Sequence, residues 1–164
     1  MNVSLTIHES GEKHLAHISK VAYADMPLKK DGWQFNWRSL SKNEDALFFK
    51  LVSSDNSEIQ GMLMLSIVDE GIVSMNNIEV APHNYGSKGK YQNVAGCLIA
   101  FACRKSFELG EGNYIGFLVF ESKTSLIEFY KNKYGATQAM GQRMFIDDLT
   151  GKKLIKEYLG VDKI

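Results

Sequence analysis

Cysteine and proline are scarce in this chain, with two of each among 164 residues. Cys97 and Cys103 lie six positions apart within one predicted helix. That spacing neither brings two thiols together for a disulfide nor suits a chelating pair. The histidines are scattered, without the spacing of metal ligands. We therefore expect two reduced thiols, with Cys97 in the core, and no metal site.

Net charge and long apolar runs are also missing. The chain carries 19 basic and 19 acidic side chains, so no overall positive field attracts nucleic acid or an anionic membrane. No apolar run approaches the roughly 18 residues of a spanning helix. The start, MNVSLTIHES, lacks the basic and apolar parts of a signal peptide. We expect a cytoplasmic protein in which any polyanion site is local, with neither nucleic acid nor membrane as partner.

The order of predicted elements favours one α/β domain over residues 1–164. A strand at 3–8 precedes a helix that opens at Ser10 and places Leu15, Ile18 and Val21 at helical spacing. The other predicted elements are strands at 46–52, 59–68 and 72–80, a helix ending near Gly110, a strand at 114–120, a helix with a Ser125–Glu128 capping box that is closed by Gly135, strands at 137–140 and 143–146, and a helix at 152–159. This order predicts a mixed, mostly antiparallel sheet of about seven strands with helices on both faces.

Three aromatic side chains lie between the first predicted helix and the second strand. Trp33, Phe35 and Trp37 are two residues apart, so an extended backbone would project all three rings to one side. They form either an aromatic edge of the core or the wall of a pocket.

The most informative stretch is NIEVAPHNYGSKGKYQNVAGCLIAFA, residues 77–102. A short apolar strand runs through a loop rich in Gly and Lys directly into a helix. Backbone amides exposed at such a helix start form an anion site. The pattern therefore predicts a site for a phosphorylated ligand.

Residues 46–147 resemble the GNAT superfamily of CoA-dependent N-acyltransferases. The strand ending Ile78-Glu79-Val80-Ala81-Pro82 matches the apolar-x-Val-x-Pro pattern of that family. Its signature of Arg or Gln, two residues, Gly, one residue, then Gly or Ala falls on residues 90–95. The helix with Phe129 and Tyr130, followed by Gly135, is similar to the family's Leu-Tyr-x-x-x-x-Gly ending.

Three positions depart from the family pattern. Lys90 stands in the Arg or Gln place, and Asn93 replaces the first glycine, whose missing side chain lets the backbone approach a pyrophosphate. Asn tolerates positive φ better than most residues, so the loop can survive this change. Lys123 takes the place of an asparagine that contacts the pantetheine arm, and could instead add a phosphate or acceptor contact.

The resemblance implies transfer of an acetyl group from acetyl-CoA to a primary amine. Tyr130 would protonate the departing thiolate, and a backbone amide of the strand through Ile78 and Val80 would stabilise the oxyanion. Glu79 is the candidate base, as the one carboxylate on the end of that strand. The implied cofactor contacts are Ile78, Val80, Lys88, Gly89, Lys90, Tyr91, Gln92, Asn93, Val94, Ala95, Gly96 and Lys123.

The acceptor would be a small molecule or a peptide, and a homodimer is left open. Trp33, Phe35 and Trp37 lie in the region that shapes the acceptor pocket in the family, and Asn77 shares the strand face of Glu79. Two alternatives remain. One is a non-catalytic acyl-CoA-binding module, and the other is a toxin that acetylates aminoacyl-tRNA. The balanced charge argues against the toxin.

Overall fold

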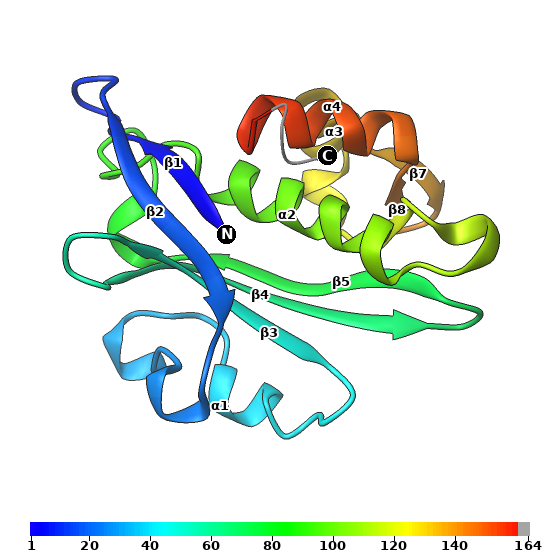
Figure 1. Cartoon of the computed structure of the whole chain (residues 1–164), viewed down its shortest axis with the longest axis horizontal. Helices are drawn as coiled ribbons and strands as arrows, with labels where there is room; N and C mark the ends of the chain where they lie inside the picture. Colours follow the sequence, from blue (N-terminus) through cyan, green and yellow to red (C-terminus); the bar gives the residue numbers. More distant parts are fainter. Residues whose placement is uncertain (161–164) are drawn as a thin grey trace. The chain divides into compact units, whose positions relative to one another are not determined.

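The computed structural model describes residues 1–160, which form one eight-stranded sheet with the strand order β1-β2-β3-β4-β5-β6-β8-β7 (Figure 1). The strands are β1 Asn2–Thr6, β2 Lys13–Lys20, β3 Leu47–Ser53, β4 Ile59–Val68, β5 Ile72–Val80, β6 Leu118–Glu121, β7 Thr137–Met140 and β8 Arg143–Ile146, and the helices are α1 Trp37–Leu40, α2 Val94–Leu109, α3 Ile127–Tyr134 and α4 Asp148–Tyr158. Strands β5 and β6 pair in parallel, whereas β1–β2, β2–β3, β6–β8 and β7–β8 pair antiparallel. The predicted mixed, mostly antiparallel sheet is confirmed.

Contacts within the chain divide it into two compact units. The first unit holds Met1–Met64 and Asn77–Leu98, and the second holds Leu65–Asn76 and the chain from Ile99. Strands β4 and β5 and helix α2 contribute residues to both units. Each unit is described by itself below.

The eighth strand is β2, where the sequence predicted a helix from Ser10. Ala16 and Ile18 are buried on one side of this strand, whereas Leu15, the residue before Ala16, is 56 % exposed. This alternation is the period of a strand, and the apparent helical spacing arose from counting Leu15 as a core residue. Gly11, at φ +74°, makes the turn that folds β2 back onto β1 as a hairpin (Figure 1).

The aromatic segment of the first unit is not extended, which corrects the prediction that its three rings share one side. A bend precedes α1, whose first residue is Trp37 and whose start is capped by the side chain of Asn36. Trp33 and Trp37 join the buried cluster of Met26, Met62, Met64 and Ala81. Phe35 is 38 % exposed and meets Trp37 edge-on, with 5.9 Å between ring centroids. The two indoles therefore serve the core, and the phenyl ring faces solvent.

In the second unit, two helix starts and one strand differ from prediction. Strand β6 begins at Leu118 because Gly116 turns the chain at φ +87°, where an added Cβ would come 2.7 Å from the Phe107 ring. The predicted capping box does not form, since a 3-10 turn at Thr124–Leu126 leads into α3 without a side-chain cap. Helix α4 begins four residues earlier than predicted, at Asp148. The predicted strands at 137–140 and 143–146 and the αL end of α3 at Gly135 are confirmed.

None of the helices in residues 1–160 combines the length and apolar character needed to span a bilayer. Within the same residues, no three His, Cys, Asp or Glu side chains are grouped to hold a metal ion.

The early start of α4 depends on Asp147, whose carboxylate accepts a hydrogen bond from the Thr150 amide at 2.8 Å. We expect Asp147→Ala to lower the free energy of unfolding by about 1 kcal/mol, because an unpaired helix amide is left behind. Asp147→Ser keeps an acceptor and should retain most of the stability. Urea unfolding of both variants checks this, and equal losses would argue against a capping role.

Candidate functional site

At the start of α2, some backbone amides donate no hydrogen bond to any described residue. Asn93 immediately precedes the helix, the position from which a side-chain oxygen usually caps the first amides. Its Oδ1 instead accepts from the Thr6 amide at 2.7 Å, and its Nδ2 donates to the Ser4 carbonyl at 3.0 Å. The first intrahelical bond is from the Cys97 amide to the Asn93 carbonyl. The amides of Val94, Ala95 and Gly96 therefore have no acceptor within residues 1–160.

Other amides of the predicted phosphate cradle are already committed to the fold. The amide of Lys90 donates to the His83 carbonyl, that of Tyr91 to the Asn84 side chain, and that of Gln92 to the Thr6 carbonyl, all at 3.0–3.1 Å. The Tyr91 ring is buried and lies 5.5 Å from the His14 ring. Of the predicted cradle, the amides left for an anion are those at the start of α2.

Gly89 has a packing reason to be glycine that the sequence did not show. An added Cβ would come 2.4 Å from the carbonyl oxygen of Asn84. Asn84 is itself fixed, because its buried amide nitrogen donates to the Gln60 side-chain oxygen at 3.0 Å. The close approach of two backbone segments thus requires glycine here without any ligand.

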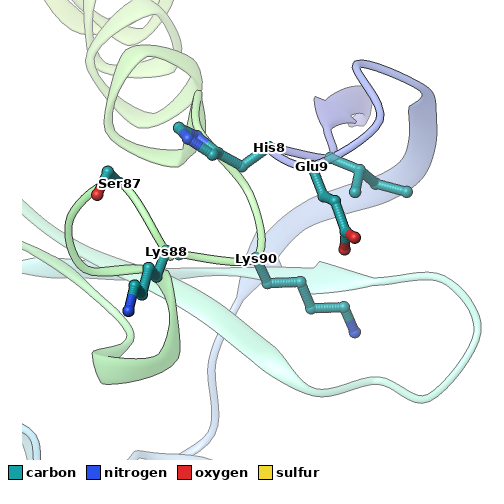
Figure 2. A pocket seen from close by; sticks show the side chains of 7 residues that line it. His8, Glu9, Ser87, Lys88 and Lys90 are labelled. Carbon is teal, nitrogen blue, oxygen red and sulfur yellow. The ribbon is translucent and has the colours of Figure 1, made fainter.

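Cationic side chains surround the loop. Lys88 and Lys90 are exposed and diverge from each other on one side of a pocket of about 370 Å³, which His8 and Glu9 border from the connection between β1 and β2 (Figure 2). The Lys90 ammonium lies 5.3 Å from the Tyr91 ring centroid. Lys13 also belongs here, since its ammonium donates to the Thr6 hydroxyl at 2.8 Å. Sequence reasoning missed Lys13 because it placed that residue in a helix; strand alternation in residues 13–18 is the signal that finds it.

Glu79 is a buried carboxylate surrounded by neutral donors. It is 7 % exposed and accepts from the Gln34 amide at 2.6 Å, the Phe35 amide at 3.1 Å and the Trp37 indole at 2.9 Å. Oε1 takes two of these bonds and Oε2 one, so Oε2 keeps acceptor capacity. No cation in residues 1–160 pairs with this carboxylate. Its negative charge is hydrogen-bonded but not neutralised.

The charge of Glu79 also reaches Tyr85, a residue that the sequence did not single out. Burial and, secondly, the Glu79 charge raise the pKa of the Tyr85 hydroxyl above its usual value. Tyr85 is 46 % exposed, so its ring is open to solvent. On the same strand as Glu79, the predicted contacts Asn77, Ile78 and Val80 are half-buried.

Tyr130 lies in the aromatic cluster of the second unit. Its ring centroid is 5.1 Å from that of Phe120, 5.5 Å from Phe129 and 6.0 Å from Tyr134. Burial raises the pKa of its hydroxyl, which keeps the phenol protonated at neutral pH. The hydroxyl has no hydrogen-bond partner within residues 1–160. Lys123 is exposed at the start of the 3-10 turn before α3.

The cysteines are excluded as nucleophiles by their surroundings. Both thiols are buried, and burial raises the pKa of Cys97 and of Cys103 to about 12. Almost no thiolate therefore exists at neutral pH. The predicted core position of Cys97 is confirmed.

Comparison with known proteins finds relatives through structure alone. No family model and no curated protein sequence matches the chain. A protein of the KacTA–DNA complex superposes with a TM-score of 0.62 at 16 % identity over 87 % of this chain and 99 % of its own. The AtaTR complex bound with AcCoA gives 0.59 at 13 % over 85 % and 98 %. A protein assigned as an acetyltransferase from Exiguobacterium sp. 255-15 gives 0.58 at 13 % over 82 % and 95 %.

The fold is GNAT-like. The likeness extends over nearly the whole lengths of these neighbours. Identities of 13–16 % establish the shared fold and no more. Within this fold, the Asn93 side chain before α2 bonds to residues of strand β1.

Gly89→Ala tests whether this glycine is required by packing. We expect it to lower the free energy of unfolding by about 1–3 kcal/mol, because the Asn84 backbone must move to admit the methyl group. Gly86→Asn is the matched control in the same loop, since Gly86 has φ +68° and open space, and Asn tolerates that conformation. Chemical denaturation compares the two, and equal stability would contradict the packing argument.

Proposed function

We propose that this protein is an N-acetyltransferase that transfers the acetyl group of acetyl-CoA to a primary amine. The observation that carries the proposal is the set of three α2 amides, at Val94, Ala95 and Gly96, that Asn93 leaves without an acceptor. Unpaired amides and the helix dipole together favour an anionic oxygen at this place. The GNAT-like fold supports the diphosphate of CoA as that anion, and the AtaTR neighbour was solved with AcCoA.

Nearby cations fit the same ligand. Lys88 and Lys90 flank the loop, and Lys13 is bonded to Thr6, the residue that engages Asn93. Each can add a charge-assisted contact to a phosphate oxygen. Contacts from Ile78, Val80 and Lys123 to the rest of acetyl-CoA remain part of the proposal.

Acetyl-CoA supplies an activated acyl group, and the protein must provide one group that accepts a proton and one that donates a proton. The acceptor amine attacks only when neutral, so its ammonium proton has to leave, and the departing thiolate has to gain one. We assign the acid role to Tyr130, whose hydroxyl stays protonated because burial raises its pKa. Since a free Tyr titrates near pH 10, this donor should remain available throughout the neutral range.

Glu79 suits the amine side of the reaction. A carboxylate without a cationic partner attracts an ammonium group, and the unused capacity of Oε2 allows one more hydrogen bond. It can hold the acceptor as ammonium and take its proton directly or through water. The exposed Phe35 ring, with Asn77 on the strand and the indoles of Trp33 and Trp37 behind, would form the acceptor wall.

A toxin that acetylates aminoacyl-tRNA is the second candidate. Two structural neighbours are described as toxins, one of them with a TM-score of 0.65 at 10 % identity. The zero net charge of this chain gives no general attraction to RNA. The same acetylation assay with charged tRNA in place of a small amine separates the two candidates.

The α2 amide site can be tested with a pair of variants that differ in charge alone. Ala95 is half-buried in the first turn of α2. We expect Ala95→Glu to weaken CoA binding by about tenfold or more relative to Ala95→Gln, since a carboxylate beside the amides competes with the diphosphate. Calorimetric titration with CoA measures this. If the two variants bind CoA equally well, or wild type shows no affinity, the site is wrong.

The proton-transfer roles require kinetics. Tyr130→Phe should lower kcat by about 10²-fold or more with CoA affinity unchanged, because a general acid contributes that much. Glu79→Gln should lower kcat/KM for the amine, and unfolding measurements must accompany it because three hydrogen bonds are altered. Tyr114→Phe is the control tyrosine. CoA binding without acetylation of any amine in a broad panel would instead support a non-catalytic binding module.

A further inference from the structure

A second pocket lies within the second unit, among residues that the proposed acetyl transfer does not use. Its volume is about 330 Å³, at the small end for ligand sites. Its lining residues come from strands β4, β5, β6 and β8 and from the turn after β4. The lining consists of Val68, Asp69, Ile72, Ser74, Val119, Phe120, Glu121 and Arg143.

The pocket combines an apolar floor with charges of both signs that are not paired with each other. Glu121 and Arg143 stand directly opposite in the β6–β8 ladder, where side chains are within reach of an ion pair. No ion pair forms between them or between either one and another residue of the described chain. Both side chains line the pocket, so a cationic and an anionic group face the same small space.

The rim of the pocket is held in place by the turn from β4 to β5. Asp69 adopts φ +50°, a conformation that Asp tolerates, and Gly71 follows at φ +102°. The Gly71 amide donates to the Val68 carbonyl, and its carbonyl accepts from the Glu111 amide at 3.0 Å. A Cβ at Gly71 would come 2.5 Å from Glu111 Cβ, so the turn is closely packed. Asp69 is therefore a second acidic group at a fixed place on the rim.

We propose that this pocket binds a free α-amino acid with an aliphatic side chain. The Arg143 guanidinium takes the carboxylate, since its planar fork matches two carboxylate oxygens. The Glu121 carboxylate, with Asp69 at the rim, takes the ammonium group. The aliphatic side chain rests on Val68, Ile72 and Val119. One zwitterion thus pairs with both the Arg143 guanidinium and the Glu121 carboxylate, which form no ion pair with each other.

The chemistry of the ligand excludes simpler occupants. A plain anion would meet the carboxylates of Glu121 and Asp69, and a plain amine would meet the guanidinium of Arg143. A molecule with both charges on one carbon skeleton complements the guanidinium and the carboxylates together. The site differs in chemistry from the α2 amides, because charged side chains rather than a row of backbone amides would hold its ligand.

The test uses wild-type protein without acetyl-CoA and three ligands of one shape. L-leucine carries both charges, L-leucinamide lacks the carboxylate, and 4-methylpentanoate lacks the ammonium group. Titration calorimetry should show L-leucine binding at least about tenfold more tightly than either analogue, as expected for loss of a charge-assisted hydrogen bond. No binding of L-leucine at millimolar concentration, or equal binding of all three, would overturn the proposal.

Variants then identify the partner of each charge. Arg143→Gln should weaken L-leucine about tenfold and leave L-leucinamide unchanged, while Glu121→Gln should weaken L-leucine and leave 4-methylpentanoate unchanged. Glu128→Gln on α3, where Glu128 pairs with Lys131, is the surface control and should change nothing. Equal effects of the three variants would overturn the assignment. Ala95→Glu should not affect leucine binding, so failure at the CoA site and failure here are distinguishable.

Discussion

The two hydrogen bonds of the Asn93 side chain are the contacts on which the rest of the candidate site depends. By accepting from Thr6 and donating to Ser4, this carboxamide ties the start of α2 to strand β1. The Gln92 amide and the Lys90 carbonyl extend the same connection to Thr6 and His8. The side chain that would ordinarily cap the helix is therefore occupied elsewhere, and the first amides of α2 stay open. A glycine at 93 would leave the amides equally open but would lose the tie to β1.

Within residues 1–160, Glu79 is left without a partner of opposite charge, just as the α2 amides are left without an acceptor. Its carboxylate is held by two backbone amides and one indole, which satisfy hydrogen bonding without supplying a positive charge. A buried ion that is bonded only to neutral donors keeps an electrostatic preference for a cation. Thus the first unit presents one positive dipole end at α2 and one negative group at Glu79. These two preferences are opposite in sign, as a phosphorylated donor and an amine acceptor require.

Much of the fold could be predicted because burial and sequence pattern agree in the strands. The limits of β4 and β5 matched the predictions, since their apolar runs end at Asp69 and at Pro82, where pattern and turn chemistry coincide. Residues 13–20 failed because Leu15 is a large apolar side chain that lies on the exposed side of β2. A pattern counts residue types, and it cannot see that one leucine faces water. The same limit applies to Trp33 and Trp37, since their spacing did not show that the chain bends between them and that both rings are buried.

The candidate site shows why a motif predicts a place better than it predicts roles. Residues 88–96 were identified as a phosphate loop, yet the amides of four of these residues, 89 to 92, donate to the protein itself. The glycine at 89 is explained by the close approach of the Asn84 backbone. Those facts depend on Thr6, Gln60 and Asn84, which approach the loop only after the chain folds. Lys13 became relevant for the same reason, because the β1–β2 hairpin carries it to Thr6. The departure at Asn93, which on sequence alone weakened the resemblance, is in the folded chain the residue that leaves the α2 amides available.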